Sequence, residues 1–311
     1  GGEISAVAEE GPVAVGLVYR KDGRPRLSAR GTGARWGIAG AGLLGASIFT
    51  YSAVFWETQA QHEYLAFRDA ERVGAVQELL LPGTTRFGGP GLWGEAWYRP
   101  ADRAGGDWWW HEVLPDGGLL VWMGDVNGHG AGPAMLTATV SGAFTALRAH
   151  QPELSVPEML EALNRQLADL GGRLLMSMTV VGVPAAGETL SVWTAGGPPA
   201  LRLRGEEIDP VGAAGSLLGE ARSGFAAGVA SIDLAPGDRV VLTTDGLLEL
   251  ESRGRPLGVR GLTKLVSRPP GRALPEVVRS LTEAVDKRLA GRPQPDDITI
   301  AVVEVGTEPP A

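Results

Sequence analysis

The sequence contains no cysteine, which excludes disulfides, thiolate metal sites and thiol catalysis. Histidine is also scarce, with four residues in a chain of 311, so a histidine-rich metal site is disfavoured. The formal net charge is −8 and no basic stripe runs along the chain, so we expect no nucleic-acid partner. If a metal binds, carboxylates must hold it, and carboxylates select hard cations such as Mg²⁺ or Mn²⁺.

The N-terminal stretch predicts the end of a larger region. The chain opens on "GGEIS" without a methionine, so we expect a fragment of a longer protein, with further domains upstream, or a processed product. Residues 12–30 alternate apolar and polar on both sides of "KDGR", which predicts a β-hairpin with Asp22-Gly23 in its turn. An isolated hairpin is only marginally stable. We therefore assign residues 1–35 to the end of an N-terminal, sensor-like region.

A charge-free stretch follows, and it predicts a transmembrane helix over residues 36–56. Residues 37–56 carry no charge. This stretch has the length that a membrane helix needs, and Trp36 and Trp56 stand at its two ends like interface anchors. Membrane association is thus expected through residues 37–56. The alternative is a buried, glycine-weakened helix of a soluble domain.

The charge bias around this stretch leaves its orientation open. The positive-inside rule would place the N-terminal side in the cytoplasm, but the rule weakens for long translocated domains. The basic residues concerned are Arg20, Lys21, Arg24, Arg26, Arg30 and Arg35. We expect the inner or cell membrane as the location, with the main domain cytoplasmic, or the cytoplasm if residues 37–56 do not span a membrane.

Residues 57–83 form the predicted linker helix. An apolar stripe recurs at spacings of four and three, and Pro82-Gly83 ends the helix. The stripe consists of Ala66, Ala70, Val73, Val76 and Leu80. This helix is a candidate for homodimerisation or signal transmission, and packing on its own domain is the equal alternative.

From residue 84 onward the pattern predicts an α+β domain over residues 84–306, with residues 307–311 as a disordered tail. Many strands with clustered helices favour packed antiparallel sheets over an alternating βαβ fold. The predicted strands are 92–99, 107–114, 118–125, 174–183, 189–195, 199–204, 228–234, 238–244 and 297–305. The predicted helices are 132–149, 155–170, 258–267 and 273–290.

Acidic residues recur at strand edges beside turns in this domain. Asp107 follows "AGG", Asp125 ends "LLVWMGD", Asp245 ends "RVVLTTD", and Asp296 and Asp297 open "DDITIAVVEV". Gathered carboxylates repel one another unless a cation neutralises them, so their clustering would imply a metal. Each taken alone is also a common turn residue, since Asp before Gly is a routine turn pair.

The segment "GDVNGHGAG" at residues 124–132 superficially resembles a calcium loop. The twelfth position counted from Asp125 is Leu136 instead of Glu, and the Lys-Ser/Thr ending of a phosphate loop is missing too. His129 lies among glycines here. It is a candidate for catalysis, although such a histidine is more often a hydrogen-bonding loop residue.

The motifs taken together carry more information than any one of them. "GGDWWW", "GDVNGHGAGPAML", "GDRVVLTTDGLLEL" and "PDDITIAVVEV" occur in this order. The chain, from about Gln77 in "VQELLLP" to Val305, strongly resembles the PPM-type metal-dependent protein phosphatases, in particular their SpoIIE/RsbU-like bacterial branch. The resemblance implies an α/β/β/α sandwich with a two-metal site in the cleft at one end.

The resemblance also implies roles for individual residues. Asp107 corresponds to the first metal ligand, Asp125 to the aspartate that bridges both metals, and Val126 would coordinate through its carbonyl. Asp245 and Asp296 correspond to ligands of the other metal, and Asp297 is secondary. Two Mn²⁺ or Mg²⁺ ions would activate a water that attacks phosphoserine or phosphothreonine in line, with His129 orienting water or protonating the leaving oxygen.

Departures from the family pattern are local. "TAGGPPA" at residues 194–200 has Thr194 and Gly197 where the family commonly has Asn and His, which predicts a weaker hydrogen-bond network in that loop. Asn127 stands where Ser is more usual, and "GGDWWW" replaces a tyrosine-rich run. None of these changes removes a predicted metal ligand.

Two functions follow from the sequence as hypotheses. The first is a membrane-tethered serine/threonine phosphatase whose substrate is a phosphorylated signalling protein, such as a STAS-type anti-sigma antagonist. The second is a catalytically inactive phosphatase fold that acts as a binding module in a membrane signalling protein. The intact set of aspartates favours the first.

Overall fold

The computed structural model describes residues 15–19, 25–29, 72–128, 130–170, 175–252, 254–266 and 273–306. The chain divides into two compact units, Gly1–Ala66 and Phe67–Ala311. In the first unit, β1 (Val15–Tyr19) pairs antiparallel with β2 (Pro25–Ala29), and Tyr19 is opposite Pro25. The hairpin predicted around Asp22-Gly23 is therefore confirmed in its strands, while the turn itself lies outside the described residues.

The second unit contains a five-stranded and a six-stranded sheet, whose neighbouring strands are all antiparallel. The five-stranded sheet has the order β11 (Gly228–Asp233), β8 (Thr189–Ala195), β7 (Met176–Val183), β6 (Leu119–Val126) and β5 (Asp107–Val113). The six-stranded sheet has the order β10 (Glu207–Val211), β9 (Ala200–Arg204), β12 (Arg239–Thr243), β15 (Ile298–Val305), β4 (Leu92–Arg99) and β3 (Arg86–Gly89). A short hairpin, β13 (Glu251–Ser252) with β14 (Arg255–Pro256), lies outside both sheets.

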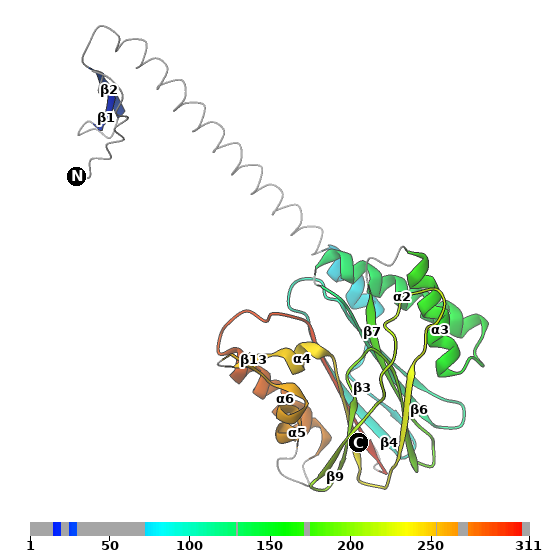
Figure 1. Cartoon of the computed structure of the whole chain (residues 1–311). Coiled ribbons are helices and arrows are strands. Elements are labelled where there is room, and N and C mark those ends of the chain that lie inside the picture. Colours follow the sequence, from blue (N-terminus) through cyan, green and yellow to red (C-terminus); the bar gives the residue numbers. More distant parts are fainter. Residues whose placement is uncertain are drawn as a thin grey trace. The chain divides into compact units, whose positions relative to one another are not determined.

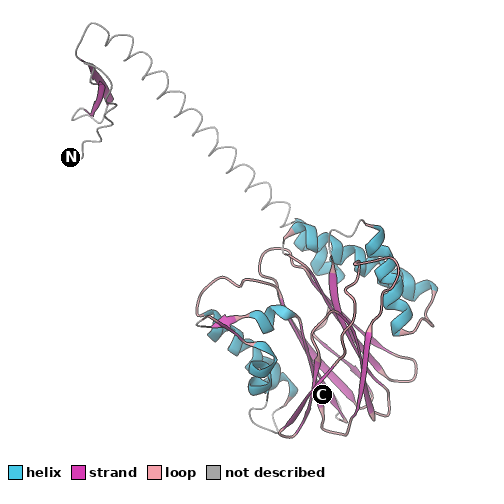
Figure 2. Ribbon diagram, in the orientation of Figure 1, coloured by secondary structure: helices cyan, strands magenta, loops and turns pink. Residues whose placement is uncertain are grey.

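Helices cover the outer face of each sheet, as Figures 1 and 2 show. Over the five-stranded sheet lie α2 (Ala131–His150) and α3 (Val156–Asp169). Over the six-stranded sheet lie α4 (Asp245–Glu249), α5 (Gly258–Val266) and α6 (Leu274–Leu289). Buried residues of both sheets form a third core between them. The predicted α+β class with two packed antiparallel sheets and flanking helices is confirmed.

Strand β6 is buried along its whole length because a core lies on each of its two faces. Successive side chains of a strand point to opposite faces, so Leu119, Val121 and Met123 contribute to the core between the sheets. Leu120 and Trp122 contribute to the core under α2 and α3. Asp125 continues the series 119, 121, 123 and thus belongs to the face between the sheets.

Helix α3 begins where the sequence requires it. Ser155 and Glu158 form a capping box, in which the Ser155 N–H donates to Glu158 Oε2 at 2.8 Å, and Pro157 stands in the first turn. These contacts satisfy backbone donors that a helix start leaves free. The apolar face of α3 then packs on the five-stranded sheet through Met159, Leu160 and Leu163.

Two expectations about elements are wrong. The strand predicted over residues 238–244 ends at Thr243, and Asp245 is the first residue of α4 instead of the last of a strand, because Thr244 takes the N-cap position. The last strand begins at Ile298, after both Asp296 and Asp297. Strands β3 and β10, the β13–β14 hairpin and helix α4 were not predicted.

The linker helix is described only from residue 72. Residues 72–80 are helical and the helix stops before Pro82-Gly83, as predicted. Its buried face differs from the predicted stripe, since Gly74 and Gln77 are buried while Val76 is 52% exposed. A Cβ at position 74 would lie 1.8 Å from the Arg103 carbonyl oxygen, so glycine lets the helix backbone approach the domain. The predicted span over residues 36–56 lies outside the described residues, and among those that are described no helix has the length and hydropathy to cross a membrane.

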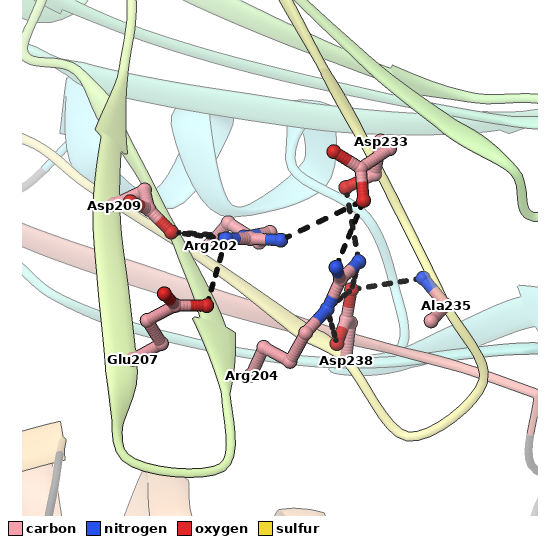
Figure 3. A network of polar contacts seen from close by, with 7 residues as sticks. All are labelled: Arg202, Arg204, Glu207, Asp209, Asp233, Ala235 and Asp238. Carbon is pink, nitrogen blue, oxygen red and sulfur yellow. Dashed lines mark hydrogen bonds and ion pairs between the residues drawn. The ribbon is translucent and has the colours of Figure 1, made fainter.

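A cluster of two arginines and four carboxylates joins the edges of the two sheets (Figure 3). The side chain of Arg202 is 5% exposed and forms ion pairs with Glu207, Asp209 and Asp233. Arg204 pairs with Asp233 at 2.8 Å and with the buried Asp238 at 2.7 Å. We call this set the arginine cluster. It joins β9 and β10 of one sheet to Asp233, the last residue of β11 in the other.

Candidate metal centre

Two of the predicted ligands face each other across a pair of strands. In the register of β5 and β6, Asp107 lies directly opposite Asp125, and both belong to the face between the sheets. Like charges directly opposite on one face of an antiparallel pair are destabilising. Asp107 is 1% exposed and Asp125 is 9% exposed, so water cannot screen this repulsion fully.

The other sheet supplies hydrogen bonds to the first of these carboxylates. Thr244 Oγ1 donates to Asp107 Oδ2 at 2.9 Å, and Thr299 Oγ1 donates to the same oxygen at 2.6 Å. Thr299 faces inward because it alternates with Ile298 and Ile300, which pack against α4 to α6. Two hydroxyls therefore fix Asp107 Oδ2, and its Oδ1 is left buried with no hydrogen-bond partner among the described residues.

The remaining predicted ligands approach from the neighbouring loop and helix. Asp245 opens α4, and Asp296 lies just before β15. A Cβ at Gly246 would lie 1.9 Å from the Asp297 carbonyl oxygen, so glycine after Asp245 is what allows the two segments to meet. Both aspartates act electrostatically on Asp125.

The pKa values of these acids record their crowding. Burial raises the pKa of Asp125, and the nearby carboxylates of Asp107, Asp245 and Asp296 raise it further. Burial also raises the pKa of Asp107, although the hydrogen bond from Thr299 opposes the shift. The pKa of Asp245 is raised by burial and then by Asp296. These carboxylates are thus unfavourable as free anions, which is the condition that a bound cation relieves.

Asp297, treated as secondary in the sequence, holds the loop before Asp107. Its Oδ1 accepts from the Ala101 N–H at 2.6 Å, and its Oδ2 accepts from the Gly106 N–H. Gly106 also lets the Val126 carbonyl approach, since a Cβ there would lie 2.6 Å from that oxygen. The buried Asp297 carboxylate therefore accepts hydrogen bonds from backbone amides rather than being free to bind a cation.

Gln77 is a contact residue that sequence reasoning missed. Its Nε2 donates to the carbonyls of Gly105 and Asp107 and to Thr137 Oγ1, and its Oε1 accepts from the Gly105 N–H at 3.0 Å. One buried amide thus ties the helix at residues 72–80 to α2 and to the backbone of a predicted ligand. Periodicity gave no signal for Gln77, because the predicted apolar stripe passes through the neighbouring Val76.

The fit of these residues to a divalent cation rests on two buried oxygens. Asp107 Oδ1 and Asp125 Oδ1 are both shielded from solvent without a hydrogen-bond partner, and hard cations prefer such carboxylate oxygens. No three His, Asp or Glu side chains in the described ranges stand close enough to form a preformed metal cage. His129 lies outside the described residues, so its predicted role stays a prediction, as does ligation by Val126.

The departures noted in the sequence are accommodated locally. Asn127 Oδ1 accepts from the Leu175 N–H at 2.7 Å and so pins the end of β6 to the residue before β7. Thr194 Oγ1 donates to the Ala213 carbonyl, so the loop with "TAGGPPA" keeps a hydrogen bond at that position. Gly197 is required by space, since a Cβ there would lie 2.4 Å from Thr179 Oγ1.

Comparison with known families decides the identity of this domain. Residues 115–306 match the family model described as Stage II sporulation protein E (SpoIIE). The chain belongs to the SpoIIE family. The SpoIIE/RsbU-like, PPM-type phosphatase resemblance drawn from the four motifs is thereby confirmed.

Solved structures share the fold of this SpoIIE-family domain. The SiaA-PP2C domain of Pseudomonas aeruginosa matches with a TM-score of 0.66 and 22% identity over 79% of this chain and 98% of that one. The RsbU and RsbW domains of a Mycobacterium tuberculosis protein match with a TM-score of 0.60 and 27% identity, over 73% of this chain and 64% of that one. The catalytic domain of the serine/threonine phosphatase PstP, solved with two manganese ions, matches with a TM-score of 0.51 and 16% identity over 70% and 99%.

Proposed function

We propose that this chain is a metal-dependent protein phosphatase that hydrolyses phosphoserine or phosphothreonine on a signalling protein. The observation that carries the proposal is the apposition of Asp107 and Asp125, each with a buried oxygen that lacks a hydrogen-bond partner among the described residues. The SpoIIE family and the manganese-bound PstP structure support it. A STAS-type anti-sigma antagonist is the substrate class we propose.

The residues of the candidate metal centre would have separate roles. Asp107, Asp125, the Val126 carbonyl, Asp245 and Asp296 would hold two Mn²⁺ or Mg²⁺ ions. When bound, such ions supply an activated water and neutralise charge on the phosphoryl group. Thr244 and Thr299 donate hydrogen bonds to Asp107 Oδ2, and Oδ1 would remain available to a cation. Asp297 fixes the loop that delivers Asp107, and His129 is proposed to position water or the leaving oxygen.

Measuring the Mn²⁺-dependent hydrolysis of p-nitrophenyl phosphate tests the proposal. The wild-type protein should hydrolyse this substrate only when the metal is present, and Asp125→Ala should reduce the rate to background. Both proteins should show a cooperative thermal unfolding transition. Equal activity in both proteins, or none in either despite folding, would favour the alternative of an inactive phosphatase fold that acts as a binding module.

Association and location belong to the same proposal. We propose that residues 37–56 tether the protein to the inner or cell membrane with the SpoIIE-family domain in the cytoplasm, and that the linker helix is a homodimer contact. On its described part, Leu79 is 83% exposed and Val76 is 52% exposed, which supports an apolar partner for this face. Vesicle flotation of the chain with and without residues 1–60 tests the tether.

A further inference from the structure

The end of α6 borders two adjoining cavities next to the candidate metal centre. The first, about 560 Å³, is lined by Gly246, which follows the predicted ligand Asp245, and by the predicted ligand Asp296. The second, about 750 Å³, lies around the last turn of α6 and the residue Ser252. Both cavities are lined by Arg292, so they meet at this side chain.

The two cavities differ in charge. Glu249, Glu251 and Asp296 line the first together with Arg292. Every ionisable side chain that lines the second is cationic, namely Lys287, Arg288 and Arg292. The whole chain carries a net charge of −8, so this cationic cavity runs against the charge of the molecule.

Hydrogen bonds to backbone carbonyls engage only some of these cationic side chains. Basic residues in a last turn complement the helix dipole, and here Arg288 donates to the Leu250 carbonyl and Arg292 to the carbonyls of Leu289 and Glu251. Lys287 differs, because it is exposed and has no hydrogen-bond or ion-pair partner within the described ranges. Its charge is available to a partner.

We propose that this cationic cavity binds an acidic segment of the phosphoprotein substrate while the phosphorylated residue occupies the cavity beside Asp296. The second part of this proposal rests on the proposed phosphatase function. The first part is a statement about binding alone: carboxylates of the partner pair with Lys287 and with those donors of Arg288 and Arg292 that do not bond to the backbone carbonyls. Substrates are thus selected by acidic residues that flank the phosphorylation site.

A binding experiment tests the proposal without needing turnover. The probe is a fluorescein-labelled peptide in which a non-hydrolysable phosphonate replaces the phosphoserine and the flanking residues are Asp and Glu. A second peptide carries Asn and Gln in their place. Fluorescence anisotropy with the full chain and Mn²⁺ should show tighter binding of the acidic peptide, and the difference should shrink as salt is added.

Charge reversal locates the effect. Lys287→Glu should weaken binding of the acidic peptide about fivefold, since an exposed attraction is replaced by a repulsion, and should leave the neutral peptide unchanged. Arg165→Glu is the matched control, because Arg165 is an exposed residue on α3. Both variants should melt at the wild-type temperature.

Equal affinity for the two peptides, or an equal loss with Arg165→Glu, would overturn the proposal. Hydrolysis of p-nitrophenyl phosphate is measured in parallel, and it should be unaffected by Lys287→Glu. Absence of that activity with a preserved preference for the acidic peptide would contradict the phosphatase function alone. Normal activity without the preference would contradict the acidic-segment site alone.

Discussion

Single hydroxyl groups fix the orientation of the most buried acid in the candidate centre. Thr299 Oγ1 donates to Asp107 Oδ2 at 2.6 Å in a fully buried environment. Thr299→Val keeps the shape of the side chain and removes this bond. We expect Mn²⁺ affinity to fall roughly tenfold or more, as is typical when an outer-shell hydrogen bond to a ligand is lost, and isothermal titration calorimetry measures it.

A neighbouring threonine provides the control for this prediction. Thr243 is also buried, but its hydroxyl donates to the carbonyls of Thr244 and Thr299 and does not contact Asp107. Thr243→Val should therefore cost stability of about 1 kcal/mol and leave Mn²⁺ affinity close to wild type. If both variants lose affinity equally, the loss comes from general destabilisation of the strands.

The raised pKa of Asp125 predicts how the metal-free protein responds to pH. A neutral Asp125 carboxyl avoids repulsion by Asp107, Asp245 and Asp296, so its contribution to stability is complete below the ordinary Asp pKa of 3.8 and is lost as the pH rises through the raised folded-state pKa. With a chelator present, Asp125→Asn should melt higher than wild type at about pH 8, because the wild-type carboxyl is ionised in the unfolded state and must take up a proton on folding.

The size of that difference should depend on pH. It should shrink toward about pH 5, because the free energy needed to protonate the unfolded-state carboxyl falls as the pH approaches its ordinary pKa of 3.8. Asp102 is exposed, so solvent screens its charge and Asp102→Asn should melt like wild type throughout. A constant difference across the pH range would mean that the amide stabilises for another reason.

Individual site residues were predictable only where the local sequence marks them. Asp107, Asp125 and Asp245 stand beside glycines at the ends of elements, and those glycines prove to be needed for close approach at Gly106 and Gly246. Thr244 and Thr299 carried no such mark. Their contact with Asp107 depends on how the two sheets face each other, and that apposition is not visible in a local pattern.

The short helix at residues 72–80 acts as an element on the candidate centre. Gln77 joins it to Gly105, Asp107 and Thr137 through four hydrogen bonds. Gln77→Ala removes these and leaves buried carbonyls unpaired, at a cost of about 1–3 kcal/mol. We expect lower Mn²⁺-dependent activity and faster hydrogen exchange in residues 104–107.

The opposite face of the same helix supplies the comparison. Leu79 is 83% exposed, so Leu79→Ala should leave hydrogen exchange in residues 104–107 unchanged. An equal effect of the two substitutions would indicate that helix propensity, and not the Gln77 side chain, governs this loop.

Elements were predicted well where one period dominates. Strand β6 and helix α3 match their expected ranges within two residues, because their patterns are long and their caps are in the sequence. β10 reads "EIDPV" and contains Pro210, which argues against a strand unless it lies at a sheet edge, where it is found. Helix α4 has only five residues, too few for a periodic signal.

At the scale of the whole molecule, two polar sites link the sheets at opposite ends of β12. Thr244 follows this strand and contacts Asp107 of the other sheet. Asp238 precedes it and accepts hydrogen bonds from Arg204 and from the Ala235 N–H. These two sites lie on either side of the core that separates the sheets, so each connects the two sheets at one end of the sandwich.

The arginine cluster should contribute to global stability. Asp238 is 2% exposed, and Asp238→Ala leaves Arg204 with fewer acceptors and the part-buried Ala235 N–H without this acceptor. We expect a loss of about 2 kcal/mol in the free energy of unfolding, measured by urea denaturation. Glu207→Gln is the control: the Glu207 side chain is 70% exposed, and exposed pairs contribute less than about 1 kcal/mol. A loss of similar size in both would contradict the assigned importance of burial.

At the other end of β12, a bound cation should connect the two sheets, because it neutralises carboxylates that otherwise repel one another. Asp107 and Asp125 come from the five-stranded sheet, whereas Asp245 and Asp296 flank strands of the six-stranded one. A ligand that binds only the folded state stabilises it by RT ln(1 + [L]/Kd), which is about 2.7 kcal/mol at a hundredfold excess over Kd. Mn²⁺ should therefore raise the melting temperature by several degrees in a concentration-dependent way. Asp125→Ala should abolish the rise, whereas Asp238→Ala should lower the starting temperature and keep the rise; a rise that survives Asp125→Ala would place the stabilising cation elsewhere.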